Sequence, residues 1–211
     1  MTRYRTQVLA LALAMAAFSP AAFAGAWETV SEGKLEDHWT TRGPWTLSDE
    51  GVFHLPEQEE KTWEHYDTYL VLKDRLVTDF EIEFEAKTSG NSGLYFHIPD
   101  LEKVAERKHV EVQIFENSKW PEDKPLGDHA AGGIIPGSPP VKDACKPGMV
   151  FNKYEIRCVG NKITVKINGE VVNEVDLDKG PAAGRSKTGG FAFQNHGHEV
   201  WLRGVKVRSL D

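Results

Sequence analysis

The chain has 211 residues, with 32 Asp and Glu against 25 Lys and Arg, and a formal net charge of −7. This acidic balance argues against a nucleic-acid partner and against binding to anionic surfaces. Six Trp and ten Phe supply aromatic rings for a hydrophobic core and for stacking on sugars alike.

The first 24 residues have the order of a secretory signal peptide. Arg3 and Arg5 precede an apolar run over residues 8–18, and the small-x-small triplet Ala22-Phe23-Ala24 follows. This order predicts cleavage after Ala24 and export to the periplasm or the medium. The apolar run is too short for a lasting membrane anchor, so no anchor is expected.

Removal of this segment leaves residues 25–211, a length sufficient for one well-cored domain. The mature chain carries 23 basic and 32 acidic residues, because Arg3 and Arg5 are removed, and its net charge is −9. No low-complexity tract or linker divides it, so a single domain over residues 25–211 is expected.

Strand patterns dominate the mature chain. Phe80–Ala86 alternates apolar and charged residues strictly, so one face of that strand should be buried. Asn168-Gly169 separates two alternating segments and predicts a tight hairpin, because a type I′ turn needs positive φ at both positions. One short helical turn is expected within residues 101–108. The expected strands cover residues 80–86, 93–98, 109–115, 154–159, 162–167, 170–175, 189–194 and 199–207.

These short, regularly spaced strands predict an all-β fold, a two-sheet jelly-roll sandwich of the concanavalin-like or LamG-like kind. Residues 117–148 differ, because their proline content favours a loop, broken at most by a short strand around Ile134. A loop this long is more often functional than idle. Cys145 and Cys158 could pair in an oxidising compartment, and the sequence leaves that question open.

The strand over residues 109–115 carries polar side chains on one face. Glu111 and Gln113 are two residues apart and point the same way, together with His109. Glu116 falls on the opposite face unless a β-bulge adds a residue. Carboxylates on one concave face suit acid and base chemistry on a sugar, and the alternative is an ordinary solvent-exposed sheet face.

A second polar segment, Gln194-Asn195-His196-Gly197-His198, follows an apolar strand. Such a segment could hold a sugar hydroxyl, a metal ion or a catalytic proton, and a structural turn is the alternative. The sequence contains no recognised metal-ligand motif, nucleophile elbow or nucleotide-binding loop. We therefore expect neither a bound metal ion nor a cofactor.

Four of these motifs, in this order, resemble one bacterial family. They are the Asn91-Ser92-Gly93 turn, the strand Val110–Glu116, the Asn168-Gly169 hairpin and the segment Phe193–Gly197. The chain resembles the 3-keto-disaccharide hydrolase domain, also called 3-keto-glucoside lyase/hydratase, from about Trp27 to Leu210. The resemblance implies a concanavalin-like jelly roll that acts on 3-keto glycosides, usually in an exported protein.

The chain departs from the family pattern at four places. His97 stands where the family usually has Arg, and Phe151 where it has Trp. Glu116 replaces the usual Asp, and Leu202-Arg203-Gly204 replaces Phe-Arg-Asn. These differences bear on substrate choice and activity, whereas the fold should tolerate them.

The chemistry of a 3-keto sugar assigns candidate catalytic roles. A ketone at C3 acidifies the C2 proton, so the reaction needs a base, a donor that stabilises the enolate, and an acid for the leaving group. Glu111 is the candidate base. His196 or Arg203 would stabilise the enolate, and His97 or Glu116 would protonate the leaving group. The substrate-binding candidates are His97, Gln113, Asn91, Gln194 and Trp120.

Two other functions fit the same sequence. A non-catalytic carbohydrate-binding module could use the same fold, because a fold alone does not fix function. A jelly-roll endo-glycosidase would place two carboxylates about 5–5.5 Å apart, and Glu111 and Glu116 have the matching spacing in the sequence.

Export makes the first testable prediction. Protein recovered from the periplasm or the medium should begin at Gly25, because Ala22-Phe23-Ala24 satisfies the small-residue rule for signal cleavage. N-terminal sequencing measures this directly. A membrane-bound product that retains Met1 would contradict it.

Overall fold

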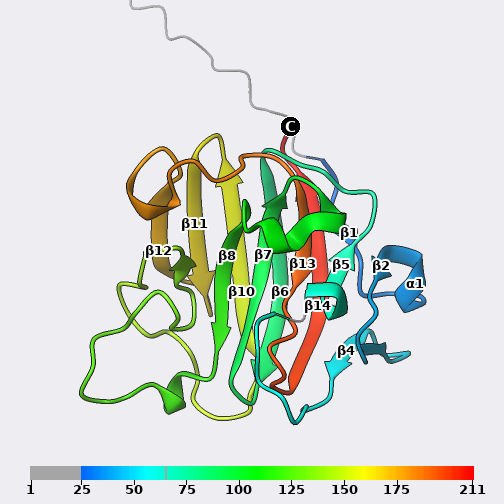
Figure 1. The fold of residues 1–211 in the computed structure, drawn as a ribbon, viewed down its shortest axis with the longest axis horizontal. Coiled ribbons are helices and arrows are strands. Elements are labelled where there is room, and N and C mark those ends of the chain that lie inside the picture. The colour runs from blue at the N-terminus through cyan, green and yellow to red at the C-terminus, as the bar shows by residue number, and fades with distance from the viewer. Residues whose placement is uncertain (1–24, 65) are drawn as a thin grey trace, which may run out of the picture.

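The computed structural model describes residues 25–64 and 66–211, and it places two antiparallel β-sheets face to face as stacked layers (Figure 1). The protein is an all-β jelly-roll sandwich, as predicted. The predicted signal peptide, residues 1–24, lies outside the described residues. Within those residues, no helix is both long enough and apolar enough to span a bilayer.

The first sheet has eight strands in the described chain, in the order β12-β11-β10-β6-β14-β4-β3, with β1 beside β14. These strands are β1 (Glu28–Thr29), β3 (Thr46–Leu47), β4 (Val52–Leu55), β6 (Phe80–Thr88), β10 (Asn152–Val159), β11 (Lys162–Ile167), β12 (Glu170–Asp176) and β14 (Val200–Ser209).

The second sheet has six strands in the described chain, in the order β2-β5-β13-β7-β8-β9. They are β2 (Trp39–Thr40), β5 (Leu70–Leu72), β7 (Asn91–Ile98), β8 (Val110–Phe115), β9 (Ile134–Ile135) and β13 (Gly190–Phe193). The described helical segments are short: α1 (Leu35–His38), η1 (Tyr66–Thr68), η2 (Leu101–Glu106), η3 (Asn117–Lys119) and η4 (Gly180–Ala182).

Aromatic side chains from both sheets interlock in the core. Phe84 of β6 stacks on Tyr154 of β10 at a centroid distance of 5.1 Å, and it meets Phe193 of β13 edge-on at 5.1 Å. Trp39 of β2 contacts both Phe193 and Phe53 of β4. The alternation predicted for residues 80–86 is confirmed, because every second residue of β6 is buried.

The outer face of the first sheet is open and charged. Glu81 pairs with Arg157 and Arg208, and Glu83 pairs with Lys153 and Lys206. These ion pairs join β6 to its two neighbours, β10 and β14. Partly exposed pairs of this kind contribute little stability each.

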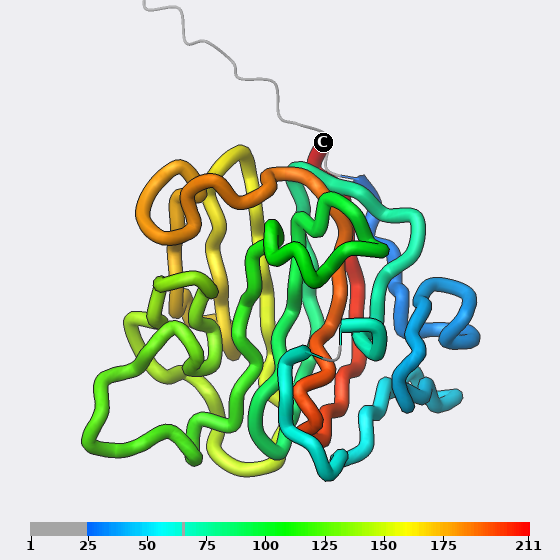
Figure 2. Tube along the Cα trace, viewed as in Figure 1, coloured from blue at the N-terminus to red at the C-terminus, as the bar shows by residue number. Residues whose placement is uncertain are grey.

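The outer face of the second sheet is covered instead. Figures 1 and 2 show the η2 segment crossing this face, where Val104 packs with Tyr69, Tyr95 and Ala192. Both faces of β8 are buried as well, up to Ile114, and loop residues such as Arg107 and His129 line a cavity beside Glu111. This corrects the alternative of an ordinary solvent-exposed face for β8.

The two cysteines are both unpaired. Cys158 is buried on β10, and Cys145 lies in the loop before that strand, beside Tyr154. Burial raises the pKa of each thiol to about 12, so neither is a reactive thiolate at neutral pH.

The interlocked aromatic core predicts a large effect of truncation. Phe84→Ala should lower the free energy of unfolding by about 3–5 kcal/mol, because it removes a buried ring between the sheets and leaves a cavity. Urea denaturation followed by tryptophan fluorescence measures the loss. Leu76→Ala is the control, since Leu76 is 61% exposed and should cost less than about 0.5 kcal/mol. Equal losses in both variants would contradict the packing.

Candidate functional site

A small cavity of about 100 Å³ lies on the covered outer face of the second sheet, where β7, β8, β9 and β13 run side by side. Its walls combine residues of these strands with Trp63, Arg107 and His129, which belong to loop segments that cover this face (the covering segments). The lining residues are Trp63, Asn91, Tyr95, Arg107, Glu111, Gln113, His129, Ile135, Gln194 and His196.

The position of Glu111 follows from the pairing of β7 with β8. Tyr95 lies directly opposite Glu111, and Gly93 lies opposite Gln113. The Glu111 side chain leans across Gly93, because a Cβ atom built on that glycine would lie 2.3 Å from Oε1 of Glu111. The glycine of the Asn-Ser-Gly turn therefore makes room for the carboxyl group.

A chain of hydrogen bonds holds the carboxyl group. Nε2 of Gln194 donates to the Tyr95 hydroxyl at 2.9 Å, and that hydroxyl hydrogen-bonds Glu111. The Tyr69 hydroxyl lies 3.4 Å from the Tyr95 hydroxyl and donates to the backbone oxygen of Trp63 at 2.9 Å. Residues from β7 and β8, from the segment directly after β13 and from the segments on either side of η1 are thus joined at one point.

Burial dominates the electrostatics of Glu111. It raises the pKa of this carboxyl to about 8, although the Tyr95 hydrogen bond and the positive charge of Arg107 act in the opposite direction. Nearby His109 stacks on Tyr95 at 4.1 Å, and its burial lowers the pKa of the imidazole to about 3. At neutral pH the site therefore contains a neutral imidazole and a carboxyl that can exchange a proton.

Two amide oxygens in the cavity have no hydrogen-bond partner among the described residues. Nε2 of Gln113 donates to Oδ1 of Asn91 at 2.8 Å, which leaves Oε1 of Gln113 unpaired. Oε1 of Gln194 is likewise buried and unpaired. Both side chains line the cavity, although these two oxygens are themselves shielded from its open space.

The structure brings five of the predicted site residues together in this cavity. They are Asn91, Glu111, Gln113, Gln194 and His196. The shared face of Glu111, Gln113 and His109 is confirmed, because their neighbours Val110, Val112 and Ile114 belong to the core.

His97 lies outside the cavity and inside the core, contrary to its expected place at the substrate. The pairing of β7 with β13 skips it, and its φ of 56° marks a β-bulge there. The bulge turns its ring against Phe80 and Phe96, and Nε2 lies 2.9 Å from the backbone oxygen of Thr78.

Arg203 and Trp120 also lie away from the cavity. Arg203 is on β14 in the other sheet, where Nε donates to Oε2 of Glu85 at 2.8 Å. Trp120 follows η3, and its indole donates to the backbone oxygen of Pro125 at 3.2 Å. The sequence order of their motifs did not reveal which sheet, or which face, would carry them.

Glu116 directly follows β8 and does not line the Glu111 cavity. Its side chain caps η3 by accepting from the backbone nitrogen of Ser118 at 3.0 Å, and it also accepts from Gly148 at 3.2 Å. It therefore fastens the 117–148 loop to the end of the strand.

Five of the lining residues were not singled out as site residues from the sequence: Trp63, Tyr95, Arg107, His129 and Ile135. Tyr95 could have been predicted, because period-2 spacing along the strand places it on the same face as Asn91 and Gly93. Arg107, Trp63 and His129 belong to covering segments, which carry no periodic pattern. The Arg107 guanidinium lies over the Trp63 ring, 4.6 Å from its centroid.

No three His, Cys, Asp or Glu side chains in the described part of the chain are grouped closely enough to hold a metal ion. The polar side chains around Glu111 are three amides, one phenol hydroxyl, two imidazoles and one guanidinium. The cavity is thus built from groups that bind hydroxyls and move protons.

Comparison with known proteins gives a family. A family model described as a 3-keto-alpha-glucoside-1,2-lyase-like domain matches residues 26–208. A 3-keto-disaccharide hydrolase of Bacteroides thetaiotaomicron is 27% identical over 172 residues. The match covers 63% of this chain and 59% of that relative, so the chain spans under two thirds of the relative's length.

Solved structures show the same architecture. A glycosyl hydrolase candidate from Parabacteroides distasonis superposes with a TM-score of 0.70 at 25% identity, covering 87% of this chain and 99% of its own. A Bacillus subtilis protein with a galectin-like fold has a TM-score of 0.60 at 13% identity, with coverages of 88% and 96%. The second likeness concerns the fold alone.

The raised pKa of Glu111 predicts a pH-dependent cost to stability. Between about pH 4.5 and pH 8 the folded protein keeps a proton that the unfolded chain has lost, so stability falls as pH rises through this window. Glutamine at position 111 cannot titrate. The free energy of unfolding of Glu111→Gln should therefore increase relative to that of the wild type between pH 5 and pH 8. Urea denaturation at a series of pH values measures the difference.

Glu81→Gln is the matched control for that measurement. The hydrogen bonds and charges of Arg208 and Arg157 lower the pKa of Glu81, although partial burial opposes them, so its stabilising effect is lost only on acidification. Between pH 5 and pH 9 this variant should run parallel to the wild type. Parallel curves for Glu111→Gln and the wild type would contradict the raised pKa.

Proposed function

Because the chain belongs to the 3-keto-alpha-glucoside-1,2-lyase-like domain family, we propose that it is an exported enzyme that cleaves the glycosidic bond of 3-keto glycosides. The observation that carries the proposal is Glu111, a buried carboxyl with a pKa of about 8 in a cavity lined by hydroxyl-binding groups. A general base works best when its pKa lies near the working pH.

The proposed reaction is an elimination followed by hydration. Glu111 takes the C2 proton, and the C2–H electron pair forms the enolate of the C3 ketone. The enolate then collapses to a C1=C2 double bond as the bond from C1 to the glycosidic oxygen breaks. The leaving oxygen takes up a proton, and addition of water to the unsaturated sugar completes a net hydrolysis.

The cation for the enolate oxygen is provided by Arg107 in this proposal. Arg107 lines the cavity, and its charge acts on Glu111, whereas Arg203 lies in the other sheet. His196 shares the cavity and remains a second candidate for this role. A donor placed where negative charge develops stabilises the transition state more than the ground state.

The leaving-group proton has a source in the cavity as well. Glu111 holds the proton taken from C2, and a carboxyl with a pKa of about 8 can return it to a departing alkoxide. The side chains first considered for this step, His97 and Glu116, do not line the cavity. The side chains of Gln113 and Gln194 line the cavity, where an amide can hydrogen-bond a sugar hydroxyl.

The endo-glycosidase alternative needs a second carboxylate next to Glu111. Glu116 is committed to the backbone nitrogens of Ser118 and Gly148, and the cavity contains no other carboxylate among its described lining residues. This arrangement favours single-base elimination over a two-carboxylate mechanism.

Glu111→Gln should lower kcat on a 3-keto glucoside by about 10²–10⁴-fold while the protein stays folded, because an amide cannot accept the C2 proton. Wild-type kcat/KM should rise with pH up to about pH 8, as Glu111 loses its proton. Both quantities follow from steady-state assays with a 3-keto glucoside and its unoxidised parent.

The control is Glu81→Gln on the opposite outer face, which should keep wild-type kcat. Full activity in both variants would remove Glu111 from the mechanism. A wild-type protein that binds the sugar but turns over no 3-keto glycoside would establish the carbohydrate-binding alternative instead.

A further inference from the structure

His129 lines the Glu111 cavity from the loop of residues 117–148. This loop reaches the cavity because its short strand β9 pairs with β8, which places Ile135 directly opposite Glu111. The His129 side chain is 60% exposed, whereas Glu111 is buried against the sheet. A ligand in the cavity therefore meets Glu111 on its sheet side and His129 at the rim.

Asp128 holds the His129 ring from the neighbouring position. Its Oδ1 lies 2.7 Å from Nδ1 of His129, and its Oδ2 accepts from the backbone nitrogen of Gly137 at 2.7 Å. Partial burial acts to raise the pKa of Asp128, but the hydrogen bonds from Gly137 and His129 outweigh it and lower that pKa, so the carboxylate is ionised at neutral pH. An ionised carboxylate can only accept, so Nδ1 carries a proton and Nε2 is the nitrogen that can exchange one with a ligand.

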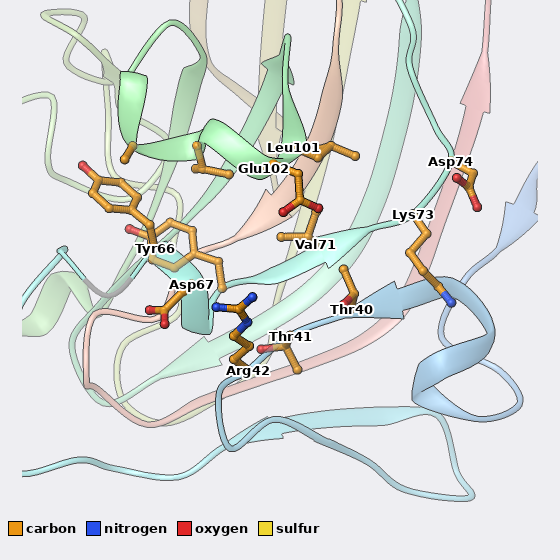
Figure 3. Close-up of a pocket in the computed structure, with 13 residues that line it drawn as sticks. Thr40, Thr41, Arg42, Tyr66, Asp67, Val71, Lys73, Asp74, Leu101 and Glu102 are labelled. Atoms are coloured by element: carbon orange, nitrogen blue, oxygen red, sulfur yellow. The ribbon is translucent and has the colours of Figure 1, made fainter.

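The cavity is too small to enclose a whole glycoside, since its volume of about 100 Å³ is below the range of about 300–1,000 Å³ that is usual for ligand sites. The larger hollow between η2 and the loop that follows β2 (Figure 3) does not extend it. The two spaces share no lining residue in the described chain, and the buried rings of Tyr69 and Tyr95 separate them. The part of a glycoside beyond the reacting sugar therefore lies at the rim, where His129 is exposed.

Stereochemistry limits what Glu111 can do with the proton that it takes. In the chair of a 3-keto glucoside the C2–H bond is axial, so the base approaches from that face of the ring. In a β-glycoside the C1–O bond is equatorial, and the same carboxyl can return its proton to the departing oxygen. In an α-glycoside the C1–O bond is axial on the opposite face, beyond the reach of that carboxyl, so a second group must supply the proton.

We propose that His129 is the general acid that protonates the departing oxygen of an α-glycoside, with Asp128 as its positioning residue. This inference rests on the proposed function, in which Glu111 takes the C2 proton. The imidazolium gives its Nε2 proton to the glycosidic oxygen as the C1–O bond breaks, which leaves neutral His129, protonated Glu111, the unsaturated sugar and a free alcohol. Water then replaces the alcohol: His129 accepts its proton as the hydroxide adds to C1, and Glu111 returns its own proton to C2. Both residues thereby regain their starting protonation states.

The test compares leaving groups of different basicity. For wild type and His129→Gln, kcat is measured on methyl 3-keto-α-glucoside, whose alkoxide needs a proton, and on 4-nitrophenyl 3-keto-α-glucoside, whose phenolate leaves without one. His129→Gln should lower kcat on the methyl glycoside by about 10²-fold or more, and far less on the nitrophenyl glycoside. Asp128→Asn should shift the ratio of the two in the same direction by a smaller factor, because the ring is present but its orientation is no longer fixed. On the two β-anomers the ratio should change little in either variant.

His54→Gln is the matched control, because His54 also pairs with a carboxylate, that of Glu199 at 2.9 Å, but lies on β4 in the other sheet. It should keep the wild-type ratio. Equal losses on both α-glycosides in His129→Gln, or no loss on either, would overturn the assignment and leave the proposed reaction intact. The assignment is also wrong if His196→Gln, and not His129→Gln, shows the dependence on the leaving group. A wild type that turns over no 3-keto glycoside would overturn the proposed function, and this inference with it.

Discussion

The site depends on the close approach of the Glu111 carboxyl to the backbone of β7 at Gly93. Only glycine leaves this space, because a Cβ atom there would lie 2.3 Å from Oε1 of Glu111. The carboxyl therefore rests against the sheet, where the Tyr95 hydroxyl reaches it and the covering segments exclude water. Its pKa of about 8 follows from this burial, and so does its capacity to exchange a proton near neutral pH.

The fold could be predicted because its signals are local. Period-2 alternation located β6 and β8, and Asn168-Gly169 located the turn between β11 and β12, where both residues have positive φ. The burial of the outer face of β8 could not be predicted, because it depends on loop segments, which contribute Trp63, Arg107 and His129, that come together only in the tertiary structure. Alternation indicates which side chains share a face, and it does not indicate what covers that face.

The candidate site was predictable where neighbours lie on one strand or on strands paired in simple register. Asn91, Glu111 and Gln113 meet because β7 and β8 pair without interruption. The expectation for His97 failed at a single β-bulge, which turned its side chain into the core. Arg203 failed for another reason, since the order of motifs along a chain does not assign strands to sheets.

The amide at position 113 suits a site with one proton-accepting group. Gln113 points the same way as Glu111, and its nitrogen is fixed by Asn91. A carboxylate in its place would repel an ionised Glu111 and raise the pKa of that group further. Two acids would then share a proton, an arrangement that serves glycosidases with paired carboxyl groups. A neutral amide leaves Glu111 as a single base with a pKa close to neutral pH, and abstraction of a weakly acidic C–H proton requires such a base.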